Sequence, residues 1–194
     1  MAHQGALFSE QSELPNGLVY RPGFLTREEE SRTLEAIAAL ALEEAVYKSY
    51  TARRRIASFG AGYDFDAHRL TPAPEMAPFL LPLRDKVARW AGLPEQAFGE
   101  ALVSEYRPGT PLGWHRDVPQ FEVIAGISLA SACRMRFRPY PPKRGDAVLA
   151  LELEPRSAYL LRGEARWSWQ HSIPPTPQLR YSITLRTRRG KARP

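Results

Sequence analysis

The second half of the chain, from Phe98 onward, is a succession of short β-type segments, and this pattern constrains the fold more than any other feature. The segments are rich in β-branched and aromatic residues and are separated by Pro/Gly turns. They cover residues 99–106, 121–130, 133–139, 146–153, 157–161, 167–173 and 179–187. Because no helical period interrupts them, they predict a β-sandwich, a jelly roll or a related barrel.

Two helices are predicted ahead of these strands. Thr26, followed three residues later by Glu29, is a capping-box signature, and apolar positions continue a helical face through about Leu42. A second helix is expected over residues 80–91, with Gly92 as its stop. Extended segments are expected at residues 18–20 and 46–66.

The length of 194 residues suits one ordinary domain, and no linker divides the chain. We therefore expect a single domain over residues 1–194 with an α+β, mainly β fold. Its N-terminal helical part would cover about residues 1–97, and its β core about residues 98–187. The two helices would pack behind the β core.

The composition is that of a globular protein, with 43% apolar and 25% charged residues. No apolar run approaches the length of a membrane span, and the first residues lack the basic and apolar stretches of a secretory signal. Cys133 is the single cysteine, which excludes an internal disulfide. These features predict an intracellular, cytoplasmic monomer that does not engage a membrane.

The chain carries a formal charge of +6, and its isoelectric point is about 9.7. Arginine dominates the excess of positive charge. Such a balance favours phosphate-bearing partners such as nucleic acid. A solvated basic surface without a partner is the alternative.

One histidine-containing stretch carries the strongest chemical signal. His115 and Asp117 are two residues apart, so on a β-strand both side chains would leave the same face. His171, arriving from a distant strand, would complete two imidazoles and one carboxylate. This ligand set leaves open positions on non-haem Fe(II) for a cosubstrate and O₂. The alternative is that the two histidines lie near loops and bind nothing.

Arg180 and Arg186 form a second constellation. On a strand they share a face with residues 182 and 184, roughly 20 Å apart at ~3.3 Å per residue. The gap between two inward-reaching guanidinium groups is then close to the length of a five-carbon dicarboxylate. A buried arginine is costly without an anionic partner. The alternative is that each arginine pairs with a surface carboxylate.

Read in order, these motifs resemble the AlkB family of Fe(II)- and 2-oxoglutarate-dependent dioxygenases over roughly residues 56–187. The motifs are Ser104-Glu105-Tyr106-Arg107-Pro108-Gly109, His115-Arg116-Asp117, His171, and Arg180 to Arg186 with Tyr181, Thr184 and Leu185 between them. The resemblance implies a double-stranded β-helix (jelly roll) with N-terminal helices and a nucleotide-recognition extension. It also implies that His115, Asp117 and His171 hold the iron.

The resemblance assigns the cosubstrate to the arginine pair. Arg180 would bind the distal carboxylate of 2-oxoglutarate with help from the Tyr106 hydroxyl. Arg186 would lie near the metal-proximal carboxylate and Asp117, and together with the metal it would keep Asp117 ionised. Ser104 and Ser182 stand where the family usually has asparagine, and their shorter hydroxyls would contact 2-oxoglutarate.

The implied reaction is oxidative demethylation of bases such as 1-methyladenine and 3-methylcytosine in DNA or RNA, with O₂ consumed and succinate, CO₂ and formaldehyde released. The expected substrate contacts are Tyr63 of the Gly62-Tyr63 pair, Phe59, Trp114, Arg134 and Arg136, with Arg138 on the same strand face. Pro119 replaces an acidic residue that helps to read the damaged base in the family. Trp167 and Trp169 are expected in the core.

Two other functions remain open from the sequence. The same oxygenase chemistry could act on a protein side chain, a tRNA modification or a small molecule, which Pro119 and the two serines favour. A non-catalytic nucleic-acid-binding jelly roll is the third reading. The complete ligand set and arginine pair argue against it.

Overall fold

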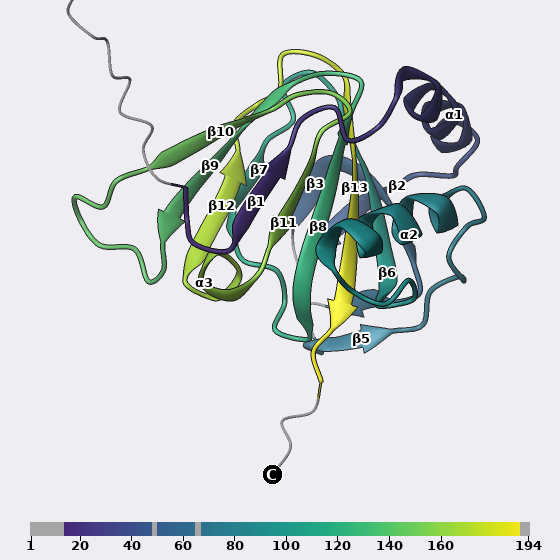
Figure 1. Ribbon diagram of the computed structural model, residues 1–194. Helices are drawn as coiled ribbons and strands as arrows, with labels where there is room; N and C mark the ends of the chain where they lie inside the picture. The colour runs from purple at the N-terminus through teal and green to yellow at the C-terminus, as the bar shows by residue number, and fades with distance from the viewer. Residues whose placement is uncertain (1–13, 48–49, 65–66, 191–194) are drawn as a thin grey trace, which may run out of the picture.

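The computed structural model describes residues 14–47, 50–64 and 67–190 (Figure 1). The elements are β1 (Leu18–Arg21), α1 (Arg27–Ala38), β2 (Glu43–Tyr47), β3 (Tyr50–Phe59), β4 (Gly62–Asp64), β5 (Arg69–Thr71), α2 (Leu80–Ala91), β6 (Phe98–Tyr106), β7 (Leu112–His115), β8 (Phe121–Leu129), β9 (Cys133–Pro139), β10 (Leu149–Leu153), β11 (Ala158–Leu161), α3 (Gly163–Trp167), β12 (Trp169–Ile173) and β13 (Arg180–Arg188).

The strands from β6 to β13 form two facing antiparallel arrays. The order is β11-β8-β13-β6 in the large sheet and β10-β9-β12-β7 in the small sheet. Because the chain passes back and forth between the two arrays, it winds as a double-stranded β-helix, and the predicted jelly roll is confirmed. Figure 1 shows the small sheet on one side of the large sheet and helices α1 and α2 on the other.

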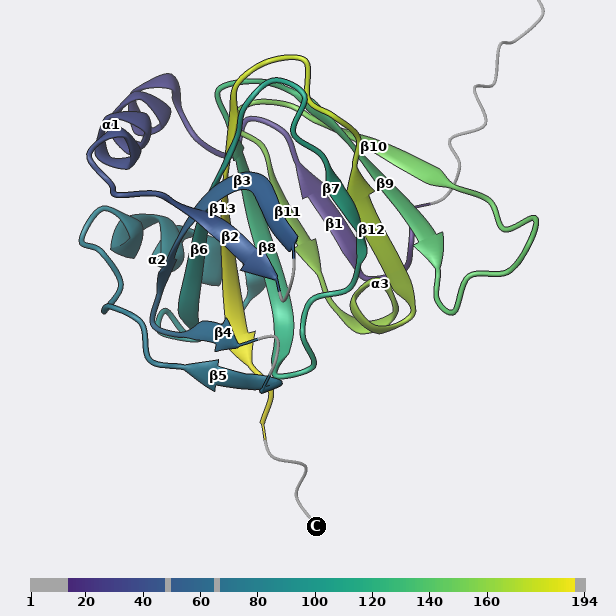
Figure 2. The same ribbon diagram turned by 180° about the vertical axis from the view of Figure 1, so that it is seen from behind.

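The N-terminal strands enlarge this core. Strand β1 pairs with β11, and β3 and then β2 extend the opposite edge of the large sheet beside β6, which gives it seven strands. Strands from both parts of the chain therefore share one sheet. The β4–β5 hairpin lies below β2 and β3, as Figure 2 shows from behind.

Two apolar clusters hold these layers together. One lies between the helices and the large sheet, where Leu80 and Val87 of α2 pack on Ile127 and Ile183. The other lies between the two sheets and includes Phe137, with the residues Phe121, Ile124, Met135, Leu153 and Leu161. A sheet buried on both faces leaves little room for polar groups inside, so those that are found there call for a functional explanation.

Strand β13 alternates as the sequence predicts. Ile183 and Leu185 face the helices and are fully buried. Arg180, Ser182 and Arg186 leave the other face of the strand, toward the small sheet, where Arg180 is only 1% exposed. The period of two therefore places the predicted polar series in the interior.

The first helix begins as predicted and ends earlier. The Thr26 hydroxyl accepts a hydrogen bond from the Glu29 N–H at 3.1 Å, and the Glu29 carboxylate accepts one from the Thr26 N–H at 2.7 Å. The helix ends at Ala38, so its predicted continuation through Leu42 is wrong, because the chain turns there into β2, which pairs with β3. The second helix covers residues 80–91, and Gly92 ends it with φ at 68°, as predicted.

The β-region departs from the sequence prediction at three places. The short helix α3 interrupts the strands, so β12 begins at Trp169 rather than at residue 167. Strand β7 was not predicted, because its turn-rich sequence becomes a strand only through pairing with β12. Strand β10 begins at Leu149 rather than 146, since Asp146 instead accepts a hydrogen bond from the Lys143 N–H in a turn.

None of the helices in the described part of the chain combines the length and the hydrophobicity that crossing a bilayer requires.

An ion cluster ties three strands of the large sheet together and makes stability depend on pH. Glu105 of β6 accepts two hydrogen bonds of 2.8 Å from Arg55 of β3, one of 3.0 Å from Arg107 and one of 3.3 Å from the Tyr181 hydroxyl of β13. The hydrogen bonds from Arg55, assisted by its charge, outweigh the effect of burial and hold the pKa of Glu105 below its usual value.

We expect Glu105→Gln to lower the free energy of unfolding by about 1 kcal/mol at pH 7, a modest value because Arg55 is partly exposed. Because the pKa is lowered in the folded state, this stabilisation is present above the ordinary glutamate pKa and is lost as the pH falls through the folded-state value. Urea unfolding at pH 7, 5, 4 and 3 should show the difference between variant and parent shrinking toward acid. Glu95→Gln, which removes an exposed ion pair, should change little. A difference that stays constant with pH would contradict this account.

Candidate metal centre

Strand pairing brings the two histidines together. His115 is the last residue of β7 and His171 lies in β12, and the two are directly opposite each other in the antiparallel register. Their rings meet edge to face with centroids 4.2 Å apart, and Phe137 packs behind His171. The Nδ1 atom of His115 lies 2.9 Å from the Gly113 carbonyl oxygen, which leaves Nε2 to point into the site.

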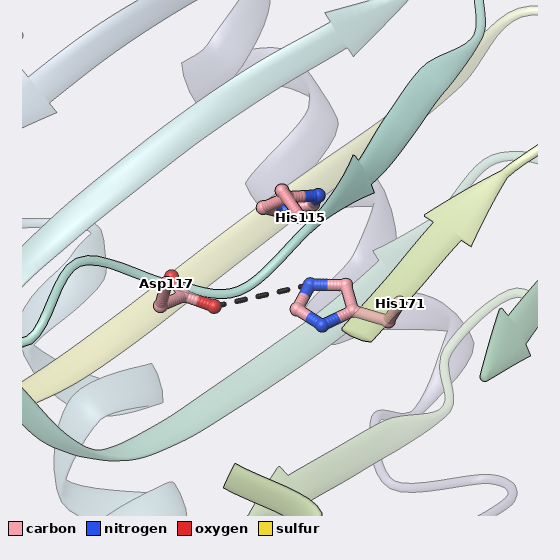
Figure 3. Close-up of side chains that lie close together, drawn as sticks. All are labelled: His115, Asp117 and His171. Atoms are coloured by element: carbon pink, nitrogen blue, oxygen red, sulfur yellow. Dashed lines mark ion pairs between the residues drawn. The ribbon is translucent and has the colours of Figure 1, made fainter. Parts of the chain in front are cut away.

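Asp117 completes the cluster from just beyond the strand. The predicted common strand face for His115 and Asp117 is wrong in detail, because β7 ends at His115. The carboxylate nevertheless turns back to the site, and its Oδ2 lies 3.8 Å from Nε2 of His171 (Figure 3). One ligand atom from each residue lies within 4.8 Å of the others, a spacing that a single ion can bridge. Two imidazoles and one carboxylate are the donor set that suits non-haem Fe(II).

The loop that carries Asp117 is fixed by a buried arginine. Arg166 of α3 is 3% exposed, and its Nη2 donates to the carbonyl oxygens of Asp117, Val118 and Phe121 at 3.1, 2.8 and 2.9 Å. Three backbone contacts from one guanidinium group hold the loop in one conformation. Sequence reasoning missed Arg166, because nothing in the local pattern distinguishes it from a surface arginine.

The electrostatics leave these three groups in the protonation states that metal binding needs. Burial lowers the pKa of His115 and lowers that of His171 to about 3, so both imidazoles are neutral. Burial alone would raise the pKa of Asp117, but the Arg186 guanidinium, whose Nε lies 3.0 Å from Oδ1, reverses the direction and holds it well below its usual value. A cation can therefore bind without first displacing protons.

A narrow cavity runs from this cluster between the sheets to Arg180. The Nε atom of Arg180 donates to the Ser128 hydroxyl at 3.0 Å, and its guanidinium carbon lies 5.1 Å from the centre of the Tyr106 ring. Its Nη1 atom is buried and has no hydrogen-bond partner. Ser104 and Ser182, which pair across β6 and β13, line the same cavity. A buried cation with an unmet donor suits a carboxylate ligand, so the donor set fits one end of a dicarboxylic acid.

Tyr159 is a second residue that sequence reasoning missed. Its side chain, on β11, lies over Gly126 of the neighbouring strand, where a Cβ atom would come within 2.2 Å of the ring. The ring therefore reaches the cavity that contains Arg180 and Ser182. Burial raises the pKa of the Tyr159 hydroxyl, which stays protonated and can donate a hydrogen bond there. The pairing of Gly126 with Tyr159 could have revealed this role, but it can be recognised only once the strand pairing is known.

A larger pocket of about 520 Å³ opens on the other side of the cluster. Its size is that of a typical small-molecule site. It is reached by His115, Asp117 and Arg186 from the core, and by Arg54 of β3 and Tyr63 of β4 from the N-terminal strands. Arg54 lines both cavities and was not predicted.

Some of the predicted substrate contacts lie at the pocket and others do not. Tyr63 lines the larger pocket, whereas Phe59 is 8% exposed and packs in the core beneath the helices, so its prediction as a stacking surface is wrong. Trp114 also lines the pocket, but the guanidinium groups of Arg136 and Arg138 lie 5.2 and 4.4 Å from the centre of its ring. Trp114 is therefore at the pocket as predicted, and its ring contacts two arginines of the neighbouring small sheet.

The three alternating arginines of β9 share one face of the strand, as predicted, and the structure shows that this is the outer face of the small sheet. Arg134 is exposed, while Arg136 and Arg138 are half-buried and donate to Ser172 and Gln170 of β12.

Of the two tryptophans expected in the core, Trp169 packs partly against it. Trp167 belongs to neither apolar cluster, and the guanidinium groups of Arg166 and Arg189 lie 4.2 and 4.7 Å from its ring centre, so its core assignment is wrong.

Residues 17–189 match the family described as the 2OG-Fe(II) oxygenase superfamily. The chain is 30% identical over 192 residues to the "Alkylated DNA repair protein ALKBH8 homolog" of Arabidopsis thaliana, covering 87% of this chain and 54% of the relative. It is 32% identical over 162 residues to the "DNA oxidative demethylase ALKBH2" of Mus musculus, covering 76% of this chain and 66% of the relative. The chain thus spans about half of one relative and about two thirds of the other.

The solved structure of OsALKBH1 superimposes with a TM-score of 0.71 over 91% of this chain and 99% of that chain, at 14% identity. A prolyl-4-hydroxylase of Pseudomonas putida superimposes with a TM-score of 0.60 at 15% identity. At these identities the likeness supports the double-stranded β-helix fold.

We expect Mn²⁺, added under anaerobic conditions, to raise the melting temperature by about 5–10 °C at a concentration 100 times its Kd, because it binds only the folded chain. His171→Ala should abolish the rise, whereas His68→Ala, which removes an exposed histidine outside the cluster, should preserve it. Differential scanning calorimetry measures both. An equal rise in the parent and in His171→Ala would place the metal elsewhere.

Proposed function

The chain belongs to the 2OG-Fe(II) oxygenase superfamily and, within it, to the AlkB family, and on this premise we propose that it oxidatively demethylates alkylated bases in DNA or RNA. The enzymes of this family are dioxygenases that use Fe(II), 2-oxoglutarate and O₂. The names of the two curated relatives, a DNA repair protein and a DNA demethylase, support nucleic acid as the substrate.

His115, Asp117 and His171 would hold the iron. When bound, the iron and 2-oxoglutarate supply the oxidation by O₂ of an N-methyl group to a hydroxymethyl group, which leaves as formaldehyde while 2-oxoglutarate becomes succinate and CO₂. Arg166 and Arg186 act on this site indirectly. The first fixes the backbone around Asp117, and the second holds its carboxylate in one orientation.

Arg180 would bind the distal carboxylate of 2-oxoglutarate, and its unmet buried Nη1 donor is the observation that supports this role most directly. Tyr159 and Tyr106 can add O–H donors, and Ser104 and Ser182 have room for further contacts. These hydroxyls would take the place of the amide groups that the family usually carries. Arg186 would lie near the metal-proximal end.

An arginine-rich face beside the pocket supports the proposal of a nucleic-acid substrate. Arg116, Arg134, Arg136 and Arg138 have no carboxylate within 4.0 Å in the part of the chain that the structure describes. Arg116 stacks 3.6 Å over the Tyr140 ring, while Arg136 and Arg138 lie over Trp114. Trp114 and Arg116 flank His115 in the chain, so this arginine face borders the larger pocket.

Aromatic contacts and hydrogen bonds hold Arg116, Arg136 and Arg138 in place, and none of these three has a carboxylate within ion-pair distance among the described residues. Arg134 lies opposite Glu152 in the pairing of β9 with β10. Arginine in such an arrangement suits phosphate. A strand bound along this face would place an extruded base in the pocket, where Tyr63 offers a stacking surface. The segment from β2 to β5 would serve as the recognition extension of a single domain.

The test is turnover of methylated oligonucleotides with Fe(II), 2-oxoglutarate and O₂. We expect demethylated base, succinate and formaldehyde in equal amounts by mass spectrometry. His115→Ala should abolish all three products. Arg180→Met should raise the KM for 2-oxoglutarate at least tenfold, and Tyr159→Phe should raise it less, with kcat little changed in the latter. Succinate without demethylated base would redirect the proposal to a protein or small-molecule substrate.

The arginine face predicts a salt dependence of binding. The logarithm of the affinity for a single-stranded oligonucleotide should fall linearly with the logarithm of the salt concentration, with a slope of about −0.7 for each phosphate contact. Replacing Arg134 and Arg136 with glutamine should reduce the magnitude of the slope by about 1.4 in fluorescence anisotropy. The matched double variant Arg27→Gln and Arg32→Gln removes two exposed charges from α1, beyond the large sheet (Figure 1), and should leave the slope unchanged. Equal effects of both pairs would contradict a specific phosphate-binding face.

A further inference from the structure

The larger pocket has a one-sided set of charges. Asp117 is the one carboxylate among its described lining residues, while Arg54, Arg116 and Arg186 contribute guanidinium-bearing side chains. The Asp117 charge is already engaged, since Arg186 lies 3.0 Å from one oxygen and the metal cluster takes the other. The described lining therefore has no acidic group left to face a positively charged ligand.

The remaining walls would penalise a cation further. Ile56, Leu102, Leu112 and Val118 line the pocket and are apolar. Moving a cation from water to such a surface is costly unless an anion meets it. A neutral base pays little for the same transfer, because its flat apolar surface gains contact.

The aromatic residues do not compensate. A ring can attract a cation through its π-face, but the Trp114 ring already contacts two guanidinium groups. Tyr63, which lines the pocket, would stack on a base of either charge, because every base has a π-face.

Resting on the proposed function, we infer that this pocket selects methylated bases that are uncharged at neutral pH, of the 1-methylguanine or 3-methylthymine type. Cationic 1-methyladenine and 3-methylcytosine, the lesions that the sequence resemblance suggests, are then the poorer substrates. The discrimination is electrostatic, because both classes have similar size and both carry the methyl group on a ring nitrogen.

The experiment compares four single-stranded oligonucleotides of one sequence that differ in a single central base. Two carry the uncharged lesions and two carry the cationic ones. We expect kcat/KM for the uncharged lesions to be at least tenfold higher, measured by mass spectrometry of the repaired base. Binding measured anaerobically by fluorescence anisotropy, with Mn²⁺ in place of iron, should rank the four oligonucleotides in the same way without any turnover.

A charge introduced at Ser58 sharpens the test. Ser58 lines the pocket from β3, opposite Leu102 of β6, and belongs to neither the metal cluster nor the Arg180 cavity. Ser58→Asp should shift the ratio of cationic to uncharged turnover at least tenfold toward the cationic lesions. Ser58→Asn, in which asparagine has nearly the shape of aspartate but no charge, should leave the ratio unchanged.

The outcomes separate the two claims. Cationic lesions that are repaired as fast as uncharged ones, or faster, would overturn the charge inference and leave base demethylation intact. An unchanged ratio in Ser58→Asp, with normal folding by circular dichroism, would overturn it as well. No repair of any of the four lesions, with 2-oxoglutarate still bound and consumed, would overturn the proposed function and the inference together.

Discussion

The antiparallel pairing of β7 with β12 is the interaction on which the site depends. It sets His115 opposite His171 across one ladder, so the separation of the two imidazoles is fixed by strand geometry and not by loop conformation. Asp117 lies just beyond the strand end, where no ladder holds it. Arg166 holds the backbone around Asp117 through three hydrogen bonds to carbonyl oxygens. Arg186 of β13 holds the Asp117 carboxylate itself. The short helix α3 thus contributes to the site, because it carries Arg166, which holds the third ligand, Asp117, in position.

The interior of the jelly roll is charged in a way that folding alone does not explain. Arg180 is 1% exposed, and its Ser128 hydrogen bond leaves another buried donor without a partner. An anion that enters the cavity would offset the cost of desolvating such a group. The native state therefore carries an unfavourable contribution that a dicarboxylate removes, and binding energy gained in this way helps to fix the cosubstrate beside the metal cluster.

Whether a feature could be predicted from the sequence depends on whether the residue acts through a local or a distant partner. The Thr26–Glu29 cap, the Gly92 stop and the alternation along β13 were predictable, because each follows from a period or a short-range hydrogen bond. Strand β7 and the role of Arg166 were not, because each depends on partners some 45 to 60 residues away in the chain. Phe59 was expected to contact the substrate, but strand β3 turns it toward the helices, which its own short segment could not reveal. The cluster of His115, Asp117 and His171 was predicted from residue spacing and ligand chemistry. That prediction did not require the secondary structure around His115 to be predicted correctly.

The arginines divide into two sets whose roles follow from their partners. Inside the jelly roll, Arg186 is engaged with Asp117 and Arg166 with backbone carbonyls, whereas Arg180 keeps a buried donor without a partner. On the outer face of the small sheet, Arg116, Arg136 and Arg138 lie against aromatic rings and neutral side chains and have no ion-pair partner in the described chain. On the proposed function, positive charge at the rim would attract a phosphate backbone, whereas the described lining of the pocket behind it has no free carboxylate to offer a cation. A strand held by its phosphates can present any base to the pocket, and it is the pocket that must discriminate. On the charge inference, discrimination at that second step would follow from the apolar walls and from the lack of a free carboxylate in the described lining of the pocket.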